Sequence, residues 1–358
     1  MKITRLRCEV VHIPFAQPIG HGLRGTDCVL AFLETDHGLV GEGFICTLFR
    51  DFTKVLYEMV RSLEPLVVGL DPQASNAFTA KAWHHVGFIG TAGVSVMGIA
   101  AIDCALWDLR AKQAEINVAR LLGAAATSVP VYNSGGLWGT RSIDELQKQA
   151  EQHVKNGYKA MKVRIGKKLD EAVARVKVVR DAIGPDIALM ADPHQIYSVS
   201  EAIRLGRMLE PYRLTWLEEP TSPEDHAGEA RIAAALDTPI ASGESVYTSR
   251  DILTMLQQQS ADILMPDLQR MGGPTEFLKA AHLAESYNVP VSPHHLHQMS
   301  LSLVAALPNA MYLEYIPWFD PLFKDELRLD SDGKAIVPDK PGWGFGFDTE
   351  AIKRLKVS

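Results

Sequence analysis

The sequence predicts an α/β protein in which a parallel β/α barrel follows a smaller α+β domain. From Val129 onward, short apolar runs alternate with helical stretches at a regular pitch, which is typical of consecutive βα units. Three successive runs end in an acidic residue, and the C-terminal ends of barrel strands form the rim that carries the chemistry of barrel enzymes. The first 120 residues lack this rhythm, so we expect them to form a domain of their own.

The N-terminal part combines three strand-like segments with two or three helices. The strand-like segments are residues 2–14, 28–35 and 39–43. Asp36, His37 and Gly38 have the composition of a hairpin turn between the last two segments. The clearest helix covers residues 98–112, and Gly123 is expected as its stop signal. This combination predicts a small α+β domain.

Eight strands are expected in the barrel. They are VPVYN (129–133), YKAMKVRIG (158–166), DIALMAD (186–192), LTWLE (214–218), PIASGE (239–244), ADILMPD (261–267), NVPVSPH (288–294) and AMYLEY (310–315). Ser142 with Glu145, and Ser198 with Glu201, predict capping boxes at the starts of two intervening helices. From about Leu327 the chain has turn chemistry instead, and we expect this tail to return to the N-terminal domain. The predicted division is therefore an N-terminal α+β domain at 1–122, the barrel at 123–326 and the returning C-terminal segment at 327–358.

Composition and charge exclude several classes of protein. The chain has 358 residues, of which 47% are hydrophobic and 22% charged, as in an ordinary globular protein with a large core. The net charge is −7 without a long run of one sign, so no nucleic-acid partner is expected. No apolar segment is long enough to span a bilayer, and the N-terminus lacks a signal-peptide pattern. The four cysteines form no CxxC pair, which favours reduced thiols and a cytoplasmic location.

The three acidic residues at the strand ends predict a metal site. Asp192, Glu218 and Glu244 end three successive predicted strands, so their carboxylates converge at the same rim. Three converging carboxylates stay ionised only if a cation neutralises them. Oxygen ligands with room for water and substrate suit a hard divalent ion, Mg²⁺ before Ca²⁺ or Mn²⁺.

Two cations and a histidine are expected near this site from the alternation of side chains along strands. Lys162 and Arg164 have the same parity, opposite to their apolar neighbours, which directs both into the barrel. The alternative is that both cations are solvated or paired with acids inside the barrel. By the same alternation, His194 shares a face with Asp192.

A second set of polar residues ends the later strands. If the strands ending at Asp267 and His294 are neighbours, the carboxylate can bond one imidazole nitrogen and leave the other as an acid or base. The histidines at 294, 295 and 297 also allow a zinc site, but no cysteine accompanies them. Glu314 ends the last strand, where it can be a buried ion-pair partner or face the substrate.

Taken in order, these motifs resemble the mandelate racemase/muconate lactonizing branch of the enolase superfamily over nearly the whole chain. The motifs are AAIDCALWDLRAK (100–112), MKVRIG (161–166), MAD (190–192), WLEEP (216–220), SGES (242–245), MPDLQRMGG (265–273), SPHHLHQ (292–298), YLEY (312–315) and PGWGFGF (341–347). The resemblance implies a modified TIM barrel, (β/α)7β, with an N-terminal α+β capping domain. It also implies Mg²⁺ on the three carboxylates and a first step that removes the proton α to a substrate carboxylate, giving an enediolate.

The resemblance further implies roles for other residues of the chain. Lys162 and Arg164 match the family's paired lysines on the second barrel strand, and Asp267 and His294 match its His/Asp dyad. Ser134 and Glu314 match residues that contact the substrate carboxylate. His21 and Arg24 belong to the loop at 16–27, which matches the loop that selects the substrate. One position departs from the pattern, because the second lysine, usually a base in the racemases, is Arg164 here. A guanidinium stays protonated, so it is a poor base and a good ligand for carboxylate. Two residues remain as substitutes for the missing base, namely Lys162, if its pKa is lowered, and His194. His194 is equally well explained as a residue that orients the metal site.

The resemblance and this departure together favour a Mg²⁺-dependent dehydratase of a sugar acid, an aldonate or an aldarate. His294 alone can remove the α-proton and then protonate the departing β-hydroxyl, whereas racemisation normally needs a base on each face. The loop residues His21 and Arg24 fit a polar carboxylate substrate. The alternatives are a racemase or epimerase that uses Lys162 or His194 opposite His294, and a non-catalytic barrel that binds metal and ligand. By analogy with the family, a homo-oligomer is expected.

Overall fold

The core of the protein is a parallel barrel sheet surrounded by helices. The computed structural model describes residues 1–357, except the side chain of His21. Within them, a seven-stranded parallel sheet has the order β10-β9-β8-β7-β6-β5-β11. Its strands are β5 (Val131–Asn133), β6 (Ala160–Arg164), β7 (Ala188–Asp192), β8 (Trp216–Glu218), β9 (Ile240–Ser242), β10 (Ile263–Leu264) and β11 (Leu313–Tyr315). The predicted α/β fold with a modified barrel is therefore confirmed.

The segment 288–294 completes the wall of the barrel, but it is not the regular strand that the sequence predicted. It is attached by isolated parallel bridges that pair Val291 with Leu264 and with Ala310, and His294 with Asp267. Pro290 and Pro293 explain the difference, because a proline has no N–H to donate to a continuous ladder. The bridges nevertheless connect β10 to the chain just before β11, so segment 288–294, the seventh predicted strand, stands where the pattern placed it.

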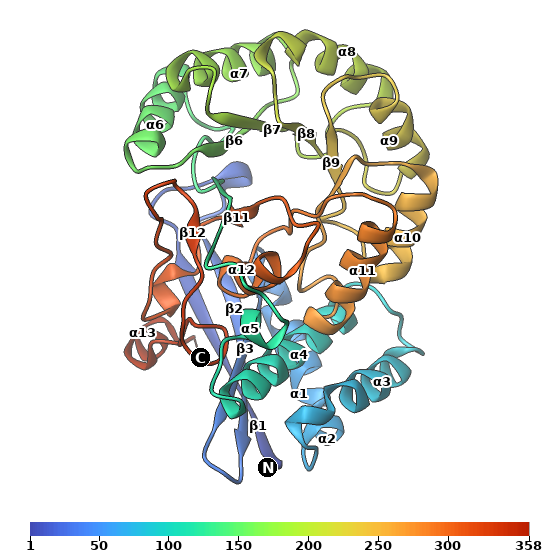
Figure 1. Ribbon diagram of the computed structural model, residues 1–358, viewed down its shortest axis with the longest axis vertical. Helices are drawn as coiled ribbons and strands as arrows, with labels where there is room; N and C mark the ends of the chain where they lie inside the picture. The colour runs from blue at the N-terminus through green and yellow to red at the C-terminus, as the bar shows by residue number, and fades with distance from the viewer. Residues whose placement is uncertain (358) are drawn as a thin grey trace.

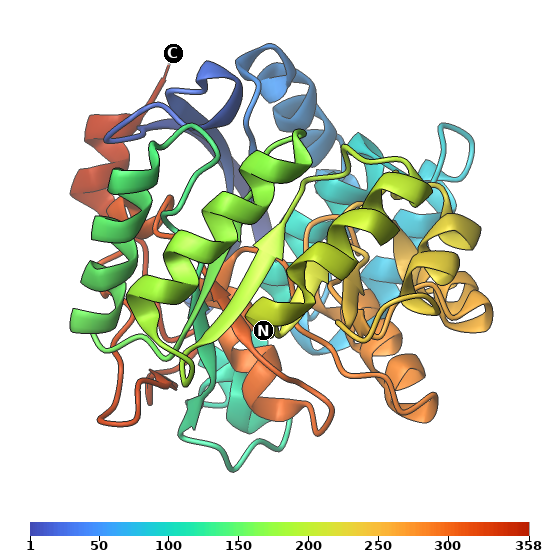
Figure 2. The same ribbon diagram turned by 90° about the horizontal axis from the view of Figure 1, so that it is seen from above.

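Seven helices follow one another around the outside of the barrel (Figures 1 and 2). They are α6 (Ile143–Lys155), α7 (Leu169–Ile183), α8 (Val199–Leu209), α9 (His226–Ala233), α10 (Thr248–Gln258), α11 (Pro274–Ser286) and α12 (His297–Ala306). The predicted capping boxes are present, because Ser142 and Glu145 on α6, and Ser198 and Glu201 on α8, bond reciprocally. Apolar faces of α6–α9 and the outward side chains of β6–β9 form one core.

The lumen of the barrel is filled by a separate apolar layer, so it is a packed core rather than a pore. Tyr132 and Trp216 meet edge to face at 5.3 Å, and Met190 and Met265 belong to the same cluster. Met190, Trp216 and Met265 each come two residues before a polar residue of the rim, namely Asp192, Glu218 and Asp267. The polar residues at the ends of the strands therefore have an apolar support beneath them.

The N-terminal domain is an antiparallel sheet covered by helices. Strands β1 (Ile3–Pro14), β2 (Gly25–Thr35) and β3 (Val40–Thr47) lie in that order. Its helices are α1 (Thr53–Ser62), α2 (Glu64–Val67), α3 (Ser75–Val86), α4 (Val94–Gln113) and α5 (Val118–Leu121). The long helix α4 packs so closely on β3 that a Cβ at Gly43 would lie 2.2 Å from the carbonyl oxygen of Ala101. Gly123 follows α5 rather than α4, so the stop signal predicted for the long helix belongs to the short one.

Specific hydrogen bonds join the N-terminal domain to the barrel. Asp103 on α4 accepts hydrogen bonds from the backbone and the hydroxyl of Thr275 at the start of α11, at 2.8 and 2.9 Å. Gly273 makes room for this contact, because a Cβ there would lie 2.6 Å from Asp103. Only glycine combines that close approach with its φ of 102° at no steric cost.

The C-terminal residues run back along the N-terminal domain, beside β1–β3 (Figure 1). The indole N–H of Trp343 donates to the carbonyl of Cys104, and its backbone N–H donates to Asp108. The last described residue, Val357, donates to the carbonyl of Val10. On the way, β12 (Ala335–Ile336) pairs with β4 (Ser128–Val129), just before the barrel begins. The predicted boundaries 1–122, 123–326 and 327–358 stay a prediction.

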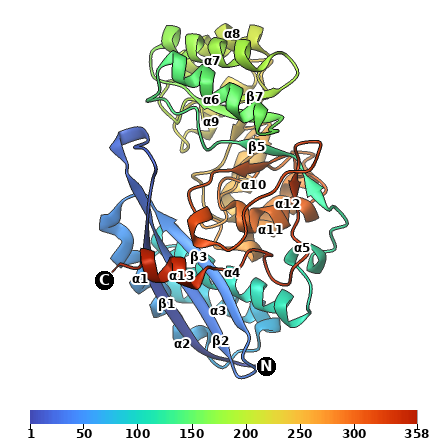
Figure 3. The ribbon, with the colours of Figure 1, turned by 90° about the vertical axis from the view of Figure 1, so that its left-hand side faces the viewer.

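A loop between β1 and β2 extends toward the barrel (Figure 3). It is closed at its base by a hydrogen bond of 2.8 Å from the Phe15 N–H to the carbonyl of Arg24. Among the described helices, none has the length and apolar character needed to cross a membrane.

Candidate active site

The three acidic residues proposed as metal ligands lie together at the rim of the barrel. Asp192 and Glu218 are the last residues of β7 and β8, and Glu244 follows β9 by two residues. All three side chains are buried, with relative exposures of 3%, 0% and 7%. Burial raises the pKa of Glu218 to about 8, and the neighbouring carboxylates act in the same direction. This buried set of oxygen donors carries more negative charge than the site itself balances, which fits a divalent cation such as Mg²⁺.

Lys162 provides part of the counter-charge from inside the barrel. Its ammonium contacts Glu218, lies 2.9 Å from Glu314 Oε1 and 3.7 Å from Asp192 Oδ2, and the residue is 1% exposed. Burial alone would lower the pKa of this lysine, but the three carboxylates outweigh it and raise the pKa. Lys162 is therefore engaged as a cation by the carboxylates in this structure, and its role as a substitute base stays a prediction.

Glu314 is fixed between Lys162 and the loop that follows segment 288–294. Its second oxygen accepts a hydrogen bond of 2.9 Å from the backbone N–H of His295. Burial acts to raise the pKa of Glu314, but the charges of Lys162 and His294 hold it below its usual range. Glu314 is thus a buried ion-pair partner of Lys162, and its predicted contact with a substrate stays a prediction.

Arg164 lies beside the carboxylates but is held by a different set of contacts. Its guanidinium donates to the carbonyl and to the hydroxyl of Ser134, at 2.9 and 3.0 Å. Its Nε lies 3.8 Å from Asp192 Oδ2, and its Cζ lies 3.7 Å from the centre of the Trp138 ring. Four contacts around one planar group leave Arg164 little rotamer freedom, which suits a preorganised ligand for an anion.

A histidine and an aspartate form a dyad on the other side of the rim. His294 Nδ1 lies 2.7 Å from Asp267 Oδ2, and His294 Nε2 lies 3.5 Å from Glu244 Oε2. Burial acts to lower the pKa of His294, but Glu244, Asp267 and Glu314 raise it to about 9. The second imidazole nitrogen, Nε2, therefore faces the carboxylate cluster, while Asp267 holds the ring in place through Nδ1.

The same region has ligand atoms of Asp267, His294 and His295 within 4.8 Å of one another. They are poorly disposed for a zinc ion. Asp267 already accepts from His294 and from the backbone N–H groups of Gln269 and Arg270, both at 2.9 Å. Burial lowers the pKa of His295 to about 3, so its ring is a neutral member of the apolar surroundings. The geometry thus favours the dyad over the zinc alternative.

For the remaining described residues of the predicted site, the structure gives no side-chain contact with this cluster. Strand β7 ends at Asp192, and His194 has a φ of 61° and an exposed side chain. The strand alternation that placed His194 beside Asp192 does not extend to this residue, so its role in the site stays a prediction. Its contact with Asp192 is a backbone N–H at 2.8 Å. Arg24 is exposed in the β1–β2 loop, and the side chain of His21 lies outside the described part of the chain.

Two supporting residues were not recognised in the sequence. Glu219 accepts hydrogen bonds from the backbone N–H groups of Gly243 and Glu244, at 2.7 and 3.2 Å, so it positions the segment that carries Glu244. The second glutamate of WLEEP was the available signal for it. Trp138 stacks on Arg164 from the loop after β5, and no period or spacing in that loop marks it.

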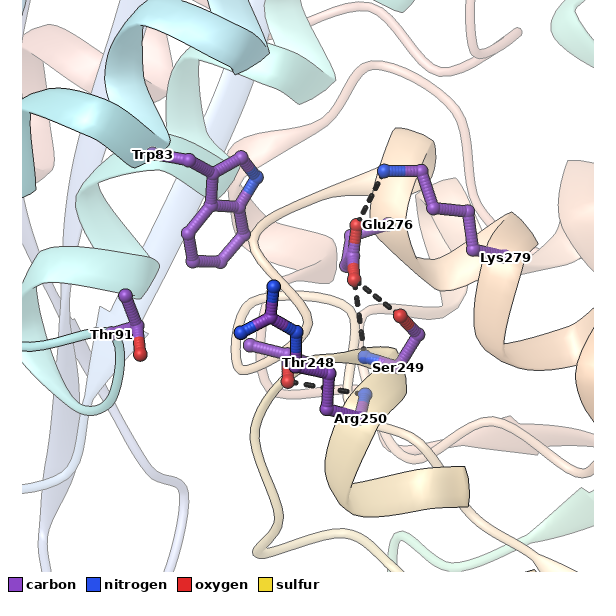
Figure 4. Close-up of a pocket in the computed structure, with 7 residues that line it drawn as sticks. All are labelled: Trp83, Thr91, Thr248, Ser249, Arg250, Glu276 and Lys279. Carbon is purple, nitrogen blue, oxygen red and sulfur yellow. Dashed lines mark hydrogen bonds and ion pairs between the residues drawn. The ribbon is translucent and has the colours of Figure 1, made fainter. Parts of the chain in front are cut away.

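A cavity of about 500 Å³ lies away from this rim, between the N-terminal domain and helices α10 and α11 (Figure 4). Trp83 and Thr91 line it from one side, and Arg250 and Lys279 from the other. Its carboxylate, Glu276, is engaged by Lys279 at 2.7 Å and by Ser249. With that acid neutralised, the cavity offers no acid–base pair comparable to His294 and Asp267.

Comparisons with known proteins agree with this architecture. Residues 4–123 match the profile of the mandelate racemase/muconate lactonizing enzyme N-terminal domain, and residues 145–351 match the enolase C-terminal domain-like profile. An L-talarate/galactarate dehydratase of Salmonella typhimurium is 32% identical over 367 residues, covering 100% of this chain and 92% of the relative. A 3,6-anhydro-alpha-L-galactonate cycloisomerase of Streptomyces coelicolor is 30% identical and covers 99% of each chain.

The structural comparison leads to the same group. The crystal structure of an L-talarate dehydratase from a Polaromonas species, complexed with Mg and L-glucarate, superposes with a TM-score of 0.93 at 32% identity. The match covers 100% of this chain and 98% of that one. The family resemblance drawn from the motifs is thereby confirmed: this chain belongs to the mandelate racemase/muconate lactonizing enzyme branch of the enolase superfamily.

Proposed function

We propose that this protein is a Mg²⁺-dependent dehydratase that removes water from a sugar acid, an aldonate or an aldarate. The observation that carries the proposal is the division of roles at the rim. His294 is the histidine whose free nitrogen faces the carboxylates, whereas Lys162 and Arg164 are engaged as cations. The names of the relatives support the reaction class, because a dehydratase is among the proteins similar over the whole chain.

Mg²⁺ fits the carboxylates of Asp192, Glu218 and Glu244, whose buried negative charge exceeds what Lys162 balances. When bound, the ion supplies Lewis-acid stabilisation of the charge that develops on a substrate carboxylate as its α-proton leaves. The structural neighbour with bound Mg supports this choice of metal.

The residues of this chain then divide the proton transfers and the binding. His294 takes the α-proton at Nε2 while Asp267 keeps the ring oriented through Nδ1. The resulting imidazolium gives the proton to the β-hydroxyl, which leaves as water, and the enol product becomes a 2-keto-3-deoxy acid. Arg164, held by Ser134, binds an anionic group of the substrate, and Lys162 balances part of the negative charge of the carboxylate cluster.

An isomerase is the second candidate, because a cycloisomerase is similar over 99% of the chain. Epimerisation would need a second base opposite His294. The ion pairs of Lys162 and the exposed position of His194 give that reaction less support than dehydration.

Proton NMR of the protein with Mg²⁺ in D₂O, against a panel of aldonates and aldarates, tests the proposal. Loss of the H2 signal with new C3 methylene signals is the expected result and identifies the substrate. Exchange of H2 for deuterium without a new product would replace dehydration by epimerisation. Absence of both reactions across the panel would overturn the sugar-acid proposal and favour a non-catalytic ligand-binding barrel.

The proposal includes a homo-oligomer in the cytoplasm with a small-molecule carboxylate as the ligand. The carboxylate ligand is supported by the L-glucarate bound to the structural neighbour. Light scattering coupled to size-exclusion chromatography tests the oligomer, and a molar mass of one chain would contradict it.

A further inference from the structure

A continuous stack of aromatic rings runs from the capping-domain loop to Arg164. The guanidinium of Arg164 lies on the Trp138 ring, with its Cζ 3.7 Å from the ring centre. Trp138 is stacked in turn on Trp318, with 5.7 Å between ring centroids and an interplanar angle of 11°. Phe15, at the start of the β1–β2 loop, lies 5.0 Å from Trp318 and tilted by 31°. Three separate segments of the chain thus meet in one stack.

The stack also contacts the side of the site that carries the dyad. The Trp318 ring meets His295 edge to face at 5.1 Å, and the His295 ring lies 5.1 Å from that of His294. Because His295 is buried and its pKa is lowered to about 3, it behaves as a neutral ring in this contact. Trp318 is therefore the one described ring that touches both the arm leading to Arg164 and the arm leading to His294.

The loop that carries Trp138 is anchored to the strand that carries Arg164. The backbone N–H of Arg164 donates to the carbonyl of Leu137 at 3.0 Å, and the N–H of Leu137 donates to Gln149 on α6 at 2.9 Å. Ser134, which accepts both guanidinium bonds, comes from the same loop as Trp138. One loop therefore defines both the edge contacts and the face contact of the guanidinium.

A guanidinium between a fixed hydrogen-bond acceptor and an indole face has a defined plane and direction. Trp138 is 9% exposed and the Arg164 side chain is 14% exposed, so this cation–π contact is largely shielded from water. The shielding strengthens the attraction between the guanidinium and the ring. The Trp318 ring restrains the Trp138 ring, and Phe15 closes the far end of the stack. A cavity of about 420 Å³ borders the rings of Phe15, Trp138 and Trp318, so no solid packing holds these rings on the side of the β1–β2 loop.

We propose that Trp138 and Trp318 are positioning residues that orient the Arg164 guanidinium toward the substrate anion, with Phe15 linking the stack to the capping-domain loop. The inference rests on the proposed role of Arg164 as an anion ligand. It assigns to the two tryptophans an effect on substrate binding that acts through Arg164 and not through the barrel core.

Steady-state kinetics in two backgrounds test the inference, with galactarate as the first probe and then any acid of the NMR panel that is turned over. In the native background, Trp138→Leu should raise KM about tenfold with a smaller change in kcat, and Trp138→Phe about threefold, because part of the ring face is kept. In an Arg164→Met background, the same two changes should each alter KM less than about twofold. Equal effects in both backgrounds would overturn the inference.

Trp107 offers a matched control. It is 7% exposed, and Arg110 lies over its ring with 4.1 Å to the centroid, but this pair belongs to α4 and contacts the barrel at Thr275 of α11, not at the rim. Trp107→Leu should lower the melting temperature as Trp138→Leu does, and leave KM unchanged. If Trp107→Leu raises KM as much as Trp138→Leu, the effect is one of general stability and the inference is wrong.

The half-buried Phe15 gives a variant that does not remove a core side chain. Phe15→Leu should raise KM while preserving the melting temperature. The fluorescence that Trp138 contributes is identified by its loss in Trp138→Phe, and Phe15→Leu should change this contribution. An unchanged KM and an unchanged emission would separate Phe15 from the stack and overturn its assigned link. If the wild-type protein converts no acid in the panel, the proposed function fails instead, and the emission change upon Arg164→Met decides whether the stack itself holds the guanidinium.

Discussion

His294 and Asp267 are joined twice, once by a parallel backbone bridge and once by the 2.7 Å contact between Nδ1 and Oδ2. The bridge brings the two side chains to the same level of the barrel wall, although they are 27 residues apart in the chain. The aspartate then holds the imidazole through Nδ1 and leaves Nε2 directed at Glu244. This relationship makes His294 the central acid–base group of the proposed reaction.

His294→Asn should abolish dehydration, because an amide cannot accept and return the α-proton. The fall in kcat should be at least about a hundredfold, as expected for loss of a general acid–base residue. Binding of Mg²⁺, measured by titration calorimetry, should persist because the three carboxylates remain. Normal turnover by this variant would contradict the mechanism.

Lys162→Met should destabilise the metal-free protein, because three buried carboxylates then lose their shared cation. Removing one partner of a buried ion pair costs roughly 3–5 kcal/mol. The free energy of unfolding, measured with urea in EDTA, checks this value. Lys177→Met is the control, since Lys177 pairs with Asp181 at the surface, and it should change stability little. Equal stability of the two variants would show that Lys162 is not required as a counter-ion.

Mg²⁺ should raise the melting temperature of the wild-type protein in a concentration-dependent way, because the ion binds the folded site and stabilises it by linkage. Glu218→Gln should remove most of this shift, since it replaces a fully buried carboxylate of the cluster by a neutral amide. Asp181→Asn, at an exposed helix position, should keep the shift. A shift that survives Glu218→Gln would move the metal site elsewhere.

Asp103 should make the stability depend on pH. Burial raises the pKa of this carboxyl from 3.8 to about 7 in the folded protein. Between these values the folded protein binds more protons than the unfolded chain, so the free energy of unfolding falls as pH rises through this window. Asp103→Asn removes the titrating group, and its free energy of unfolding should fall less between about pH 4 and about pH 7.

Urea unfolding of both proteins across that range measures the difference in slope. Asp108, whose pKa burial raises to about 6, contributes the same decline in both proteins and therefore cancels in the comparison. Parallel pH profiles for wild type and Asp103→Asn would show that Asp103 does not titrate in this window.

The local pattern of the sequence was sufficient for most of the barrel. Ser142 and Ser198 cap their helices as predicted, because a capping box is formed within four consecutive residues. The ends of β7 and β8 at Asp192 and Glu218 could also be predicted from the sequence, because each strand is a short apolar run that is buried in the barrel. The strand rule does not reach His194, because its left-handed backbone breaks the alternation beyond the end of β7.

The identity of the carboxylates, the cations and the dyad residues was therefore determined by the sequence alone, because strand period and barrel topology fix which positions meet at the rim. Apart from the contact of Asp267 with His294, which of these groups touch each other was decided only by the tertiary structure. The pairing of Lys162 with Glu218 and Glu314, and the stacking of Arg164 on Trp138 and Trp318, depend on distances between segments far apart in the chain. Such contacts arise from the closure of the barrel and the docking of the capping domain, and no local pattern encodes them.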